Sequence, residues 1–403
     1  MTWDRLPSTR RERAIEWPLW AAVAGLMLFG AAFIFSATGA VDSAEGLPWW
    51  RFRVLNQTLA YLLGIGAVVV LCLVDYARLA RWALVAYWIS VVLLVAVALF
   101  GVARLGAKRW IDFGPVQFQP SEFAKLAFLF ALANFLARPP GELNSPLLFA
   151  KALGMALLPF VLILKQPDLG SSLVFVPVAL VMMFVAGVPR KFLLRFIGGS
   201  VLLVVLILVD VMFAPPGWRF ITLEDYQKHR LLVYFALDFA PRNASPAERL
   251  AARAEQEKKS YNVKQALISV GSGGFVGKGW RSGTQSALGY LPRAVAHNDF
   301  IFSVIAEETG FLGSVAVLTL YGVVLFSGIK IASQARDRLG RLLAVGVVAL
   351  LFTHIFVNIG MNIRMVPVTG IPLPLLSAGG TSVLCSLIAV GILQNIYLHR
   401  RHY

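Results

Sequence analysis

The chain has 403 residues, of which 58% are hydrophobic and only 14% are charged, and its net charge is +16 at pH 7. No soluble domain can bury so much apolar surface, and the mean hydropathy of +0.73 agrees with that conclusion. The composition therefore excludes a soluble globular protein and predicts one that crosses a membrane many times.

Apolar stretches of about 17–25 residues recur along the chain, each long enough to cross a bilayer as a helix. Because these runs are continuous rather than alternating, we expect an all-α polytopic membrane protein. About ten transmembrane helices are predicted by this criterion, near 18–38, 54–74, 82–102, 119–137, 149–165, 171–188, 192–213, 299–329, 341–361 and 376–398. Residues 1–403 would form a single transmembrane domain with one large loop at 214–298.

The basic residues are concentrated on alternate short connections between the predicted spans. Arg78 with Arg81, Arg190 with Lys191, and the N-terminal arginines all belong to this set. The positive-inside rule places these connections and both termini in the cytoplasm, so that the 214–298 loop is extracytoplasmic. Membrane topology therefore accounts for the net charge, and no nucleic-acid partner is expected.

Some basic residues lie on the predicted outer side, against this bias. Arg109, Lys165 and Arg364 are on short outer stretches or close to the end of a span. Positive charge at these positions suggests an anionic ligand, and contacts with phospholipid headgroups are the alternative.

The fourth span opens with QPSEFAKLAFLF, in which Glu122 and Lys125 are three residues apart. At this spacing the two side chains lie on one face of a helix and can form an ion pair in a low-dielectric environment. The pair could lock this helix to its neighbours or bind substrate directly.

Two outer stretches have local signals of their own. Asp168, in KQPDLGSS, lies between two spans and could cap the following helix or take part in chemistry. The stretch GSGGFVGKG at 271–279 does not fit the phosphate-loop pattern, because Gly279 stands where Ser or Thr is required. Its backbone amides could still bind a substrate phosphate.

Two further stretches have predictable backbones. SPAERLAARAEQEKK opens with a capping box of Ser245 and Glu248 and is predicted to be a charged surface helix. The prolines of PVTGIPLP at 367–374 cannot continue a regular helix, so irregular backbone lining a cavity is expected there.

Asp299 is the sharpest candidate for a catalytic group, since it stands at the start of an apolar segment with His297 just before it. If a helix begins at Asp299, then Glu307 lies about 12 Å deeper and about 80° around the axis. The two carboxylates could not then act on one atom, and Glu307 and Glu308 would pair with groups on neighbouring spans. For Asp299 itself, the alternative to catalysis is a helix N-cap.

Several long stretches together resemble the SEDS family (shape, elongation, division and sporulation) of peptidoglycan polymerases. They are KRWIDFGPVQFQPSEFAKL, KQPDLGSSL, GSGGFVGKGWRSGTQ, HNDFIFSVIAEETGFLG and NIGMNIRMVPVTGIPLPLLSAGGTS. Their order and spacing match the family, and GTQ, NIGMN and PVTGIPLP are closer to its rod-shape branch than to its division branch. Ala378 departs from the family, where a tyrosine is usual, and the charged stretch 241–260 looks like an insertion.

The resemblance implies a glycosyltransferase of the bacterial cytoplasmic membrane that polymerises lipid II at the outer face during cell elongation. It also implies a class B penicillin-binding protein as partner, with other membrane proteins of the elongation complex. Asp299 matches the family's essential aspartate and is the predicted base. Arg109, Glu122, Lys125 and Asp168 match other family positions, and the predicted substrate site is completed by Lys165, Arg364 and His297.

Two rival functions and one cofactor question remain open. A flippase for a lipid-linked precursor would also have broken helices and intramembrane charges, and a non-catalytic scaffold is a further alternative. The outward bias of the polar residues favours the enzyme over the flippase. A divalent cation, Mg²⁺ or Mn²⁺, could help to stabilise the leaving diphosphate, but no cluster of metal ligands stands out in the sequence.

Overall fold

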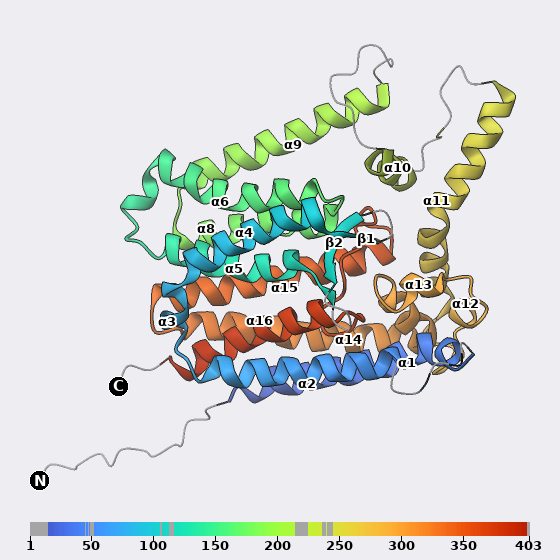
Figure 1. Cartoon of the computed structure of the whole chain (residues 1–403), viewed down its shortest axis with the longest axis horizontal. Coiled ribbons are helices and arrows are strands. Elements are labelled where there is room, and N and C mark those ends of the chain that lie inside the picture. Colours follow the sequence, from blue (N-terminus) through green and yellow to red (C-terminus); the bar gives the residue numbers. More distant parts are fainter. Residues whose placement is uncertain are drawn as a thin grey trace, which may run out of the picture.

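The computed structural model describes residues 15–400 except 45, 47, 49–51, 105, 106, 113–116, 214–224, 236–238 and 240–244. Long helices packed along one direction form most of the molecule (Figure 1). Within the described residues, nine helical segments are long and apolar enough to span a membrane. The predicted all-α polytopic fold is confirmed.

The bundle helices are α1 (Trp17–Ala44), α2 (Arg53–Cys72), α4 (Ala83–Phe100), α5 (Pro120–Leu136), α6 (Pro146–Leu164), α8 (Phe175–Ala186), α9 (Arg190–Phe213), α14 (Ile301–Ser333), α15 (Arg338–Asn362) and α16 (Gly380–Leu398). Shorter connecting elements are α3 (Tyr76–Arg81), the 3-10 turn Glu142–Asn144 and α7 (Leu169–Leu173). The expected span at 119–137 is α5, which has only 17 residues and is not among the nine. Since α4, α6, α8 and α15 all pack against α5, the polar groups in its first turns are buried.

The polar elements gather at one end of the bundle. They are the strands β1 (Val102–Arg104), β2 (Ala107–Asp112) and β3 (Gln117–Phe118), and the helices α10 (Asp225–Tyr234), α11 (Pro246–Ser272), α12 (Thr284–Ala287) and α13 (Arg293–Ala296). Helix α1 begins, and α16 ends, at the opposite end (Figure 1). The described helices of the 214–298 loop are thus at the end opposite to the start of α1, as predicted, and the side facing the cytoplasm is still a prediction from the charge pattern.

The segment between the predicted spans 82–102 and 119–137 contains a small antiparallel sheet in the order β1-β2-β3. Val102 pairs with Trp110, and Ile111 pairs with Phe118. Strands this short leave too few alternating positions to be recognised from the sequence. The sheet matters for the site because β2 includes Arg109.

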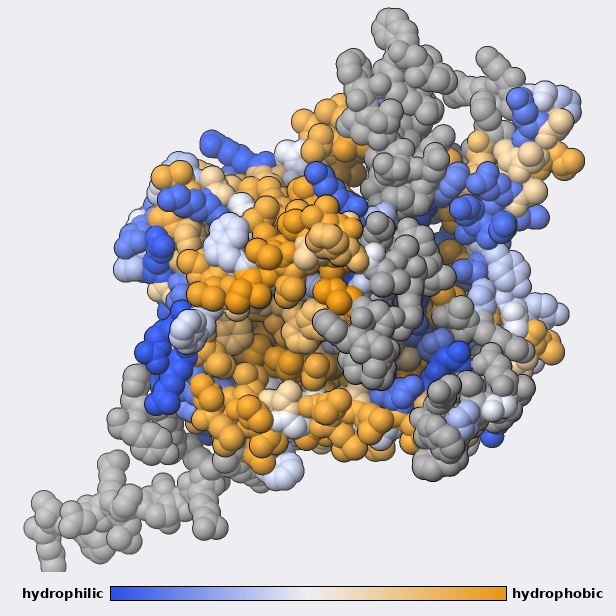
Figure 2. Space-filling model, in the orientation of Figure 1, coloured by the Kyte–Doolittle hydropathy of each residue, from blue (hydrophilic) through white to orange (hydrophobic). Residues whose placement is uncertain are grey.

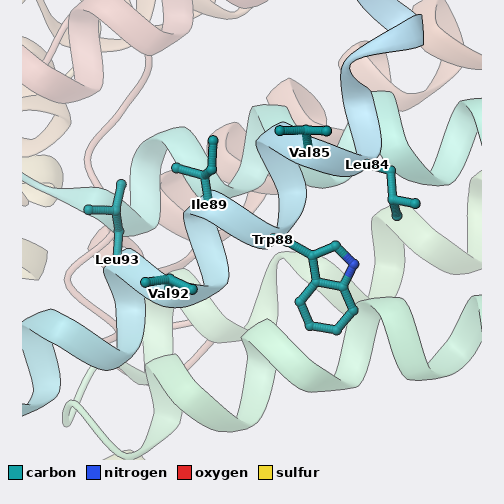
Figure 3. Close-up of a pocket in the computed structure, with 6 residues that line it drawn as sticks. All are labelled: Leu84, Val85, Trp88, Ile89, Val92 and Leu93. Carbon is teal, nitrogen blue, oxygen red and sulfur yellow. The ribbon is translucent and has the colours of Figure 1, made fainter.

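Apolar side chains cover the flank of the bundle, and hydrophilic ones lie toward its ends (Figure 2). A groove of about 480 Å³ on α4 belongs to this flank and is lined by Leu84, Val85, Trp88, Ile89, Val92 and Leu93 (Figure 3). All six side chains are apolar, as expected for a surface that faces lipid tails.

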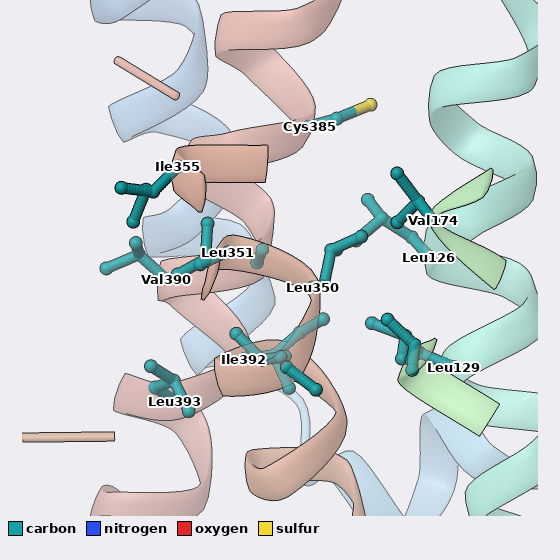
Figure 4. Close-up of a cluster of buried hydrophobic side chains, with 14 of the residues drawn as sticks. Leu126, Leu129, Val174, Leu350, Leu351, Ile355, Cys385, Val390, Ile392 and Leu393 are labelled. Carbon is teal, nitrogen blue, oxygen red and sulfur yellow. The ribbon is translucent and has the colours of Figure 1, made fainter. Parts of the chain in front are cut away.

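The interior is closely packed where α5, α15 and α16 meet. Leu126 and Leu129 of α5 and Leu350 of α15 are among the buried residues, and Leu350 is directed toward Leu126 (Figure 4). Val390 and Leu393 of α16 are also in this cluster. This packing fixes the polar ends of α5 and α15, on which the site is built.

Helix α14 consists of two helical segments joined by a kink at Gly310, where φ is 65° and ψ is −157°. Only glycine adopts such a conformation readily. The glycine-rich turn fills the break, because the amides of Lys278 and Gly279 each donate at 3.0 Å to the carbonyls of Glu307 and Glu308. The amides of Lys278 and Gly279 therefore bind protein carbonyls and are not available to a substrate phosphate.

The carboxylate of Glu307 is fully buried, but its partners are not on neighbouring spans as expected. Its Oε1 accepts from Lys278 Nζ at 2.6 Å and from Thr284 Oγ1 at 3.1 Å, and both partners belong to the 214–298 loop. The prediction for Glu308 is confirmed, since it accepts from the Ser36 hydroxyl of α1 at 2.6 Å. The first segment of α14 thus holds the outer loop rather than carrying charges deep into the bundle.

Candidate functional site

Asp299 lies just before α14, at the polar end of the bundle. The N-cap position of α14 is Phe300, and no side chain caps that helix end. The N-cap alternative for Asp299 is therefore excluded, and the expected helix start at Asp299 is corrected to Ile301. The carboxylate is left available for another role.

The backbone at 297–299 is held by hydrogen bonds to three successive carbonyl groups. The His297 carbonyl accepts from the Ala378 amide at 2.9 Å, and the Asn298 carbonyl accepts from the Ser377 hydroxyl at 2.6 Å. The third, that of the aspartate, accepts from Asn358 at 3.1 Å and from Asn362 at 3.2 Å. Because α15 and the stretch before α16 supply these donors, tertiary packing fixes the backbone from which the Asp299 side chain projects.

One side of the site is built from Arg109 and residues 166–168, here called the QPD turn. The Arg109 guanidinium donates to the backbone carbonyls of Gln166 and Pro167, and its Nη1 lies 3.7 Å from Asp168 Oδ1. Asp168 also accepts from the Ser171 amide at 3.1 Å, which confirms the predicted cap of the following helix, α7. Asp168 thus caps a helix and pairs with the arginine that faces the site.

The loop after α15 closes the site from another direction, with the irregular backbone that its prolines predict. Gly370 has a φ of 76°, and a β-carbon at this position would lie 3.5 Å from Asp299 Oδ2. The neighbouring Thr369 carbonyl packs against Gly170 of α7 so closely that a β-carbon on Gly170 would clash with it at 2.7 Å. Two glycines therefore allow the QPDLG and PVTGIP stretches to meet beside the carboxylate.

The other side of Asp299 opens into a cavity of about 260 Å³. Its polar lining includes His229 and Arg230 of α10, Lys259 of α11, Arg364 and Asp299 itself. The remaining lining residues are Val233, Tyr234, Asn262, Val263, Val295, Phe300, Val366, Pro367 and Val368. Asp299 is thus a carboxylate in the wall of a cavity with a basic lining.

Burial raises the pKa of the Asp299 carboxyl to about 6, against the lowering effect of the guanidinium groups of Arg109 and Arg230. The nearby Asp168 carboxylate adds to the upward shift. A carboxyl with this pKa is mostly ionised at neutral pH and is a stronger base than an ordinary aspartate. Such a shift is typical of functional carboxylates.

Glu122 and Lys125 form the ion pair that their spacing predicts, with Lys125 Nζ 2.7 Å from Glu122 Oε1. The two residues are only 2% and 3% exposed. The same Nζ lies 3.0 Å from His354 Nε2 of α15, one helical turn before the Asn358 that holds Asp299. The pair thus ties α5 to α15 next to the site, through contacts with other protein groups.

The three other predicted site residues do not all line the cavity beside Asp299. Arg364 lines the cavity and donates to the Val233 carbonyl at 3.2 Å. His297 is buried, and its carbonyl belongs to the tethered backbone described above. Lys165 is exposed at the C-cap of α6 and does not line the cavity.

Sequence reasoning missed Arg230, Lys259 and the two tethering asparagines as parts of one site. Arg230 and Lys259 are ordinary basic residues of a long loop, and no local pattern marks either of them. Their positions depend on how α10 and α11 pack against the bundle.

No group of three or more His, Cys, Asp or Glu side chains that could hold a metal ion occurs in the part of the chain that the structure describes. These residues alone do not provide a metal site around Asp299. The divalent cation is still a prediction of the sequence, and no step of the reaction proposed below depends on it.

The fold and the site define a polytopic membrane protein with a basic cavity and a tethered carboxylate at one end of its helical bundle. The family of FtsW, RodA and SpoVE, described as cell cycle proteins, matches residues 16–402, and the chain belongs to this family. The resemblance seen in the sequence motifs is therefore confirmed.

Relatives and solved structures agree with this assignment. The chain is 37% identical to the peptidoglycan glycosyltransferase MrdB of Escherichia coli strain K12, with 93% of this chain and 91% of the relative covered. It is 33% identical to the peptidoglycan glycosyltransferase RodA of Treponema pallidum, with 92% and 94% covered. A chain from a structure on the coordination of polymerization and crosslinking by a peptidoglycan synthase complex is 29% identical, with a TM-score of 0.76 and 97% and 99% covered. The Thermus thermophilus rod shape determining protein RodA is 26% identical, with a TM-score of 0.65 and 98% and 100% covered.

Proposed function

We propose that this protein polymerises lipid II into glycan strands at the outer face of the cytoplasmic membrane, with Asp299 as the general base. The chain is a multi-pass membrane protein and a peptidoglycan glycosyltransferase, the activity of relatives that match it over most of its length. The observation that carries the proposal is the tethered Asp299 carboxylate in the wall of a basic cavity.

In the proposed reaction, Asp299 takes the proton of the GlcNAc 4-hydroxyl of one lipid II molecule as that oxygen attacks the anomeric carbon of MurNAc in the other substrate. A glycosidic bond forms, the bond from that carbon to the diphosphate oxygen breaks, and the lipid diphosphate leaves with the electron pair. Arg109 is held beside Asp168 by the QPD turn and is suited to stabilise the developing negative charge.

A class B penicillin-binding protein is the proposed partner, because the glycan strands must be crosslinked after they are made. The structural neighbour from a peptidoglycan synthase complex, in which polymerization is coordinated with crosslinking, supports this pairing. The motifs of the rod-shape branch support a role of the proposed pair in cell elongation.

Purified protein incubated with lipid II in detergent tests the function directly. Detergent micelles have no second leaflet, so a flippase would show no product there. We expect glycan strands, detected by gel electrophoresis of labelled lipid II, and more of them with the transpeptidase present. If no strands form with or without the partner, the polymerase proposal is wrong, and a flippase or a scaffold becomes the better explanation.

A further inference from the structure

The cavity beside Asp299 carries an excess of positive charge. Arg230, Lys259 and Arg364 line it with His229, and among the lining residues only Asp299 is acidic. These side chains come from α10, α11 and the loop after α15, so tertiary packing brings them together. A concave site lined by one sign of charge attracts ligands of the opposite sign.

Two of the basic side chains are positioned by hydrogen bonds to backbone carbonyls. Arg364 donates to the Val233 carbonyl at 3.2 Å, and Arg230 approaches the Thr369 carbonyl at 3.5 Å. Such a bond uses one of the five N–H donors of a guanidinium. Lys259 is exposed on the face of α11 that borders the cavity.

The Asp299 carboxylate interacts electrostatically with two arginines from different parts of the chain. Arg109 comes from β2 and the QPD turn, and Arg230 comes from α10 in the outer loop, and both lower the pKa of Asp299. Polymerisation of lipid II joins two anionic substrates at one base. In the proposed function, Arg109 stabilises the departing diphosphate. The cavity on the Arg230 side is therefore available to a second anionic group.

We propose that this cavity is a subsite for an anionic oxygen group of lipid II, with Arg230 and Lys259 as its principal ligands. This inference rests on the proposed function and gives the outer-loop helix α11 a direct part in substrate binding. Lipid II carries anionic oxygens in its diphosphate and in the carboxylates of its stem peptide. The apolar part of the lining, including Val233 and Val263, suits the hydrocarbon next to either group.

Adjacent lysines on α11 provide a matched test. Lys258 and Lys259 are both exposed, but only Lys259 lines the cavity. Lys259→Gln in the full-length protein, assayed with its transpeptidase partner, should raise KM for lipid II about tenfold, as expected for loss of one charge-assisted hydrogen bond. The value of kcat should not change, and Lys258→Gln should leave both constants at their wild-type values.

A second substrate identifies which anionic group occupies the cavity. Lipid II with amidated stem-peptide carboxylates should already have a high KM with the wild type, and Lys259→Gln should add nothing, if the peptide carboxylate binds here. If the diphosphate binds here, the substitution should raise KM by the same factor for both forms of lipid II. Both results support an anion subsite and differ only in its occupant.

Binding of fluorescent lipid II to the detergent-solubilised protein separates failure of this inference from failure of the proposed function. An equal Kd for Lys259→Gln, Lys258→Gln and the wild type, with equal KM values, would overturn the subsite while leaving the polymerase intact. If the wild type makes no glycan, the polymerase proposal fails. A weaker Kd for Lys259→Gln alone would then still support the subsite.

Discussion

At the residue scale, the site depends on the Asp299 carboxylate, whose residue has a backbone held in place by hydrogen bonds. Three successive carbonyls at 297–299 are bound by groups from α15 and from the stretch before α16, while Asp299 itself caps no helix. This arrangement separates catalysis from local structure, because a change confined to the carboxylate should leave its tethers in place.

Asp299→Asn should abolish most glycan synthesis, since an amide of nearly the same shape cannot accept the proton. General-base contributions are typically about 10²–10⁴-fold in rate. Burial of the charge is unfavourable for folding, so the variant should be at least as thermally stable as the wild type. Polymerisation rates and melting temperatures in detergent test both points. Near-wild-type synthesis would exclude Asp299 as the base and make Asp168 the next candidate.

The pH dependence follows from the pKa of Asp299, which burial raises to about 6. Polymerisation should slow as pH falls through about 6, because a protonated carboxyl cannot act as the base. The effect on folding has the opposite sign: a raised folded-state pKa contributes stability below about pH 4, and this contribution is lost as pH rises through about 6. Loss of rate near pH 5 should therefore be reversed at neutral pH without unfolding, and a rate that stays constant over this range would contradict the assignment.

At the element scale, contacts between helices decide which charges are tolerated inside the bundle. Lys125 on α5 contacts Glu122 of the same helix and His354 of α15, so the ion pair is also a joint between two helices. The kink of α14 at Gly310 is a second joint, which the glycine-rich turn and Lys278 fill from the outer loop.

Replacing one member of the α5 pair should leave a buried charge uncompensated. Glu122→Gln or Lys125→Met alone should lower the free energy of unfolding by about 3–5 kcal/mol, as for other buried pairs. The double variant should lose less than the sum of the two. Melting temperatures of the purified variants measure this coupling, and Lys151→Met, at an exposed position on α6, is the control. If the single variants melt like the wild type, the two charges are not coupled.

At the scale of the whole molecule, the site lies at the end of the helical bundle opposite to the start of α1 and the end of α16 (Figure 1). The short helix α3, with Arg78 and Arg81, lies at the same end as the start of α1 (Figure 1), whereas α10, α11 and α13 line the cavity beside Asp299. An extracytoplasmic site suits a polymer that is built outside the cell, and this orientation can be tested without any assay of activity.

In a background without Cys72 and Cys385, a cysteine at position 253 should react with a membrane-impermeant maleimide in intact cells. Arg253 is exposed on α11, the helix that lies at the site end of the molecule (Figure 1). Gln334→Cys, at the exposed end of α14 near the termini, should react only after permeabilisation. The reverse labelling pattern would place the site in the cytoplasm and refute the proposed reaction at the outer face.

Sequence by itself determined the class of the protein and most of its helices, and it predicted several polar residues of the candidate site. Long apolar runs predict helices, the i and i+3 spacing predicts the Glu122–Lys125 contact, and the family motifs point to Asp299, because these signals are local. Only the tertiary structure decided that Asp299 is tethered rather than capping, that Glu307 binds the outer loop, and that Arg230 and Lys259 share its cavity. These features join residues far apart in the chain, so their contacts depend on how the helices pack and not on any local pattern.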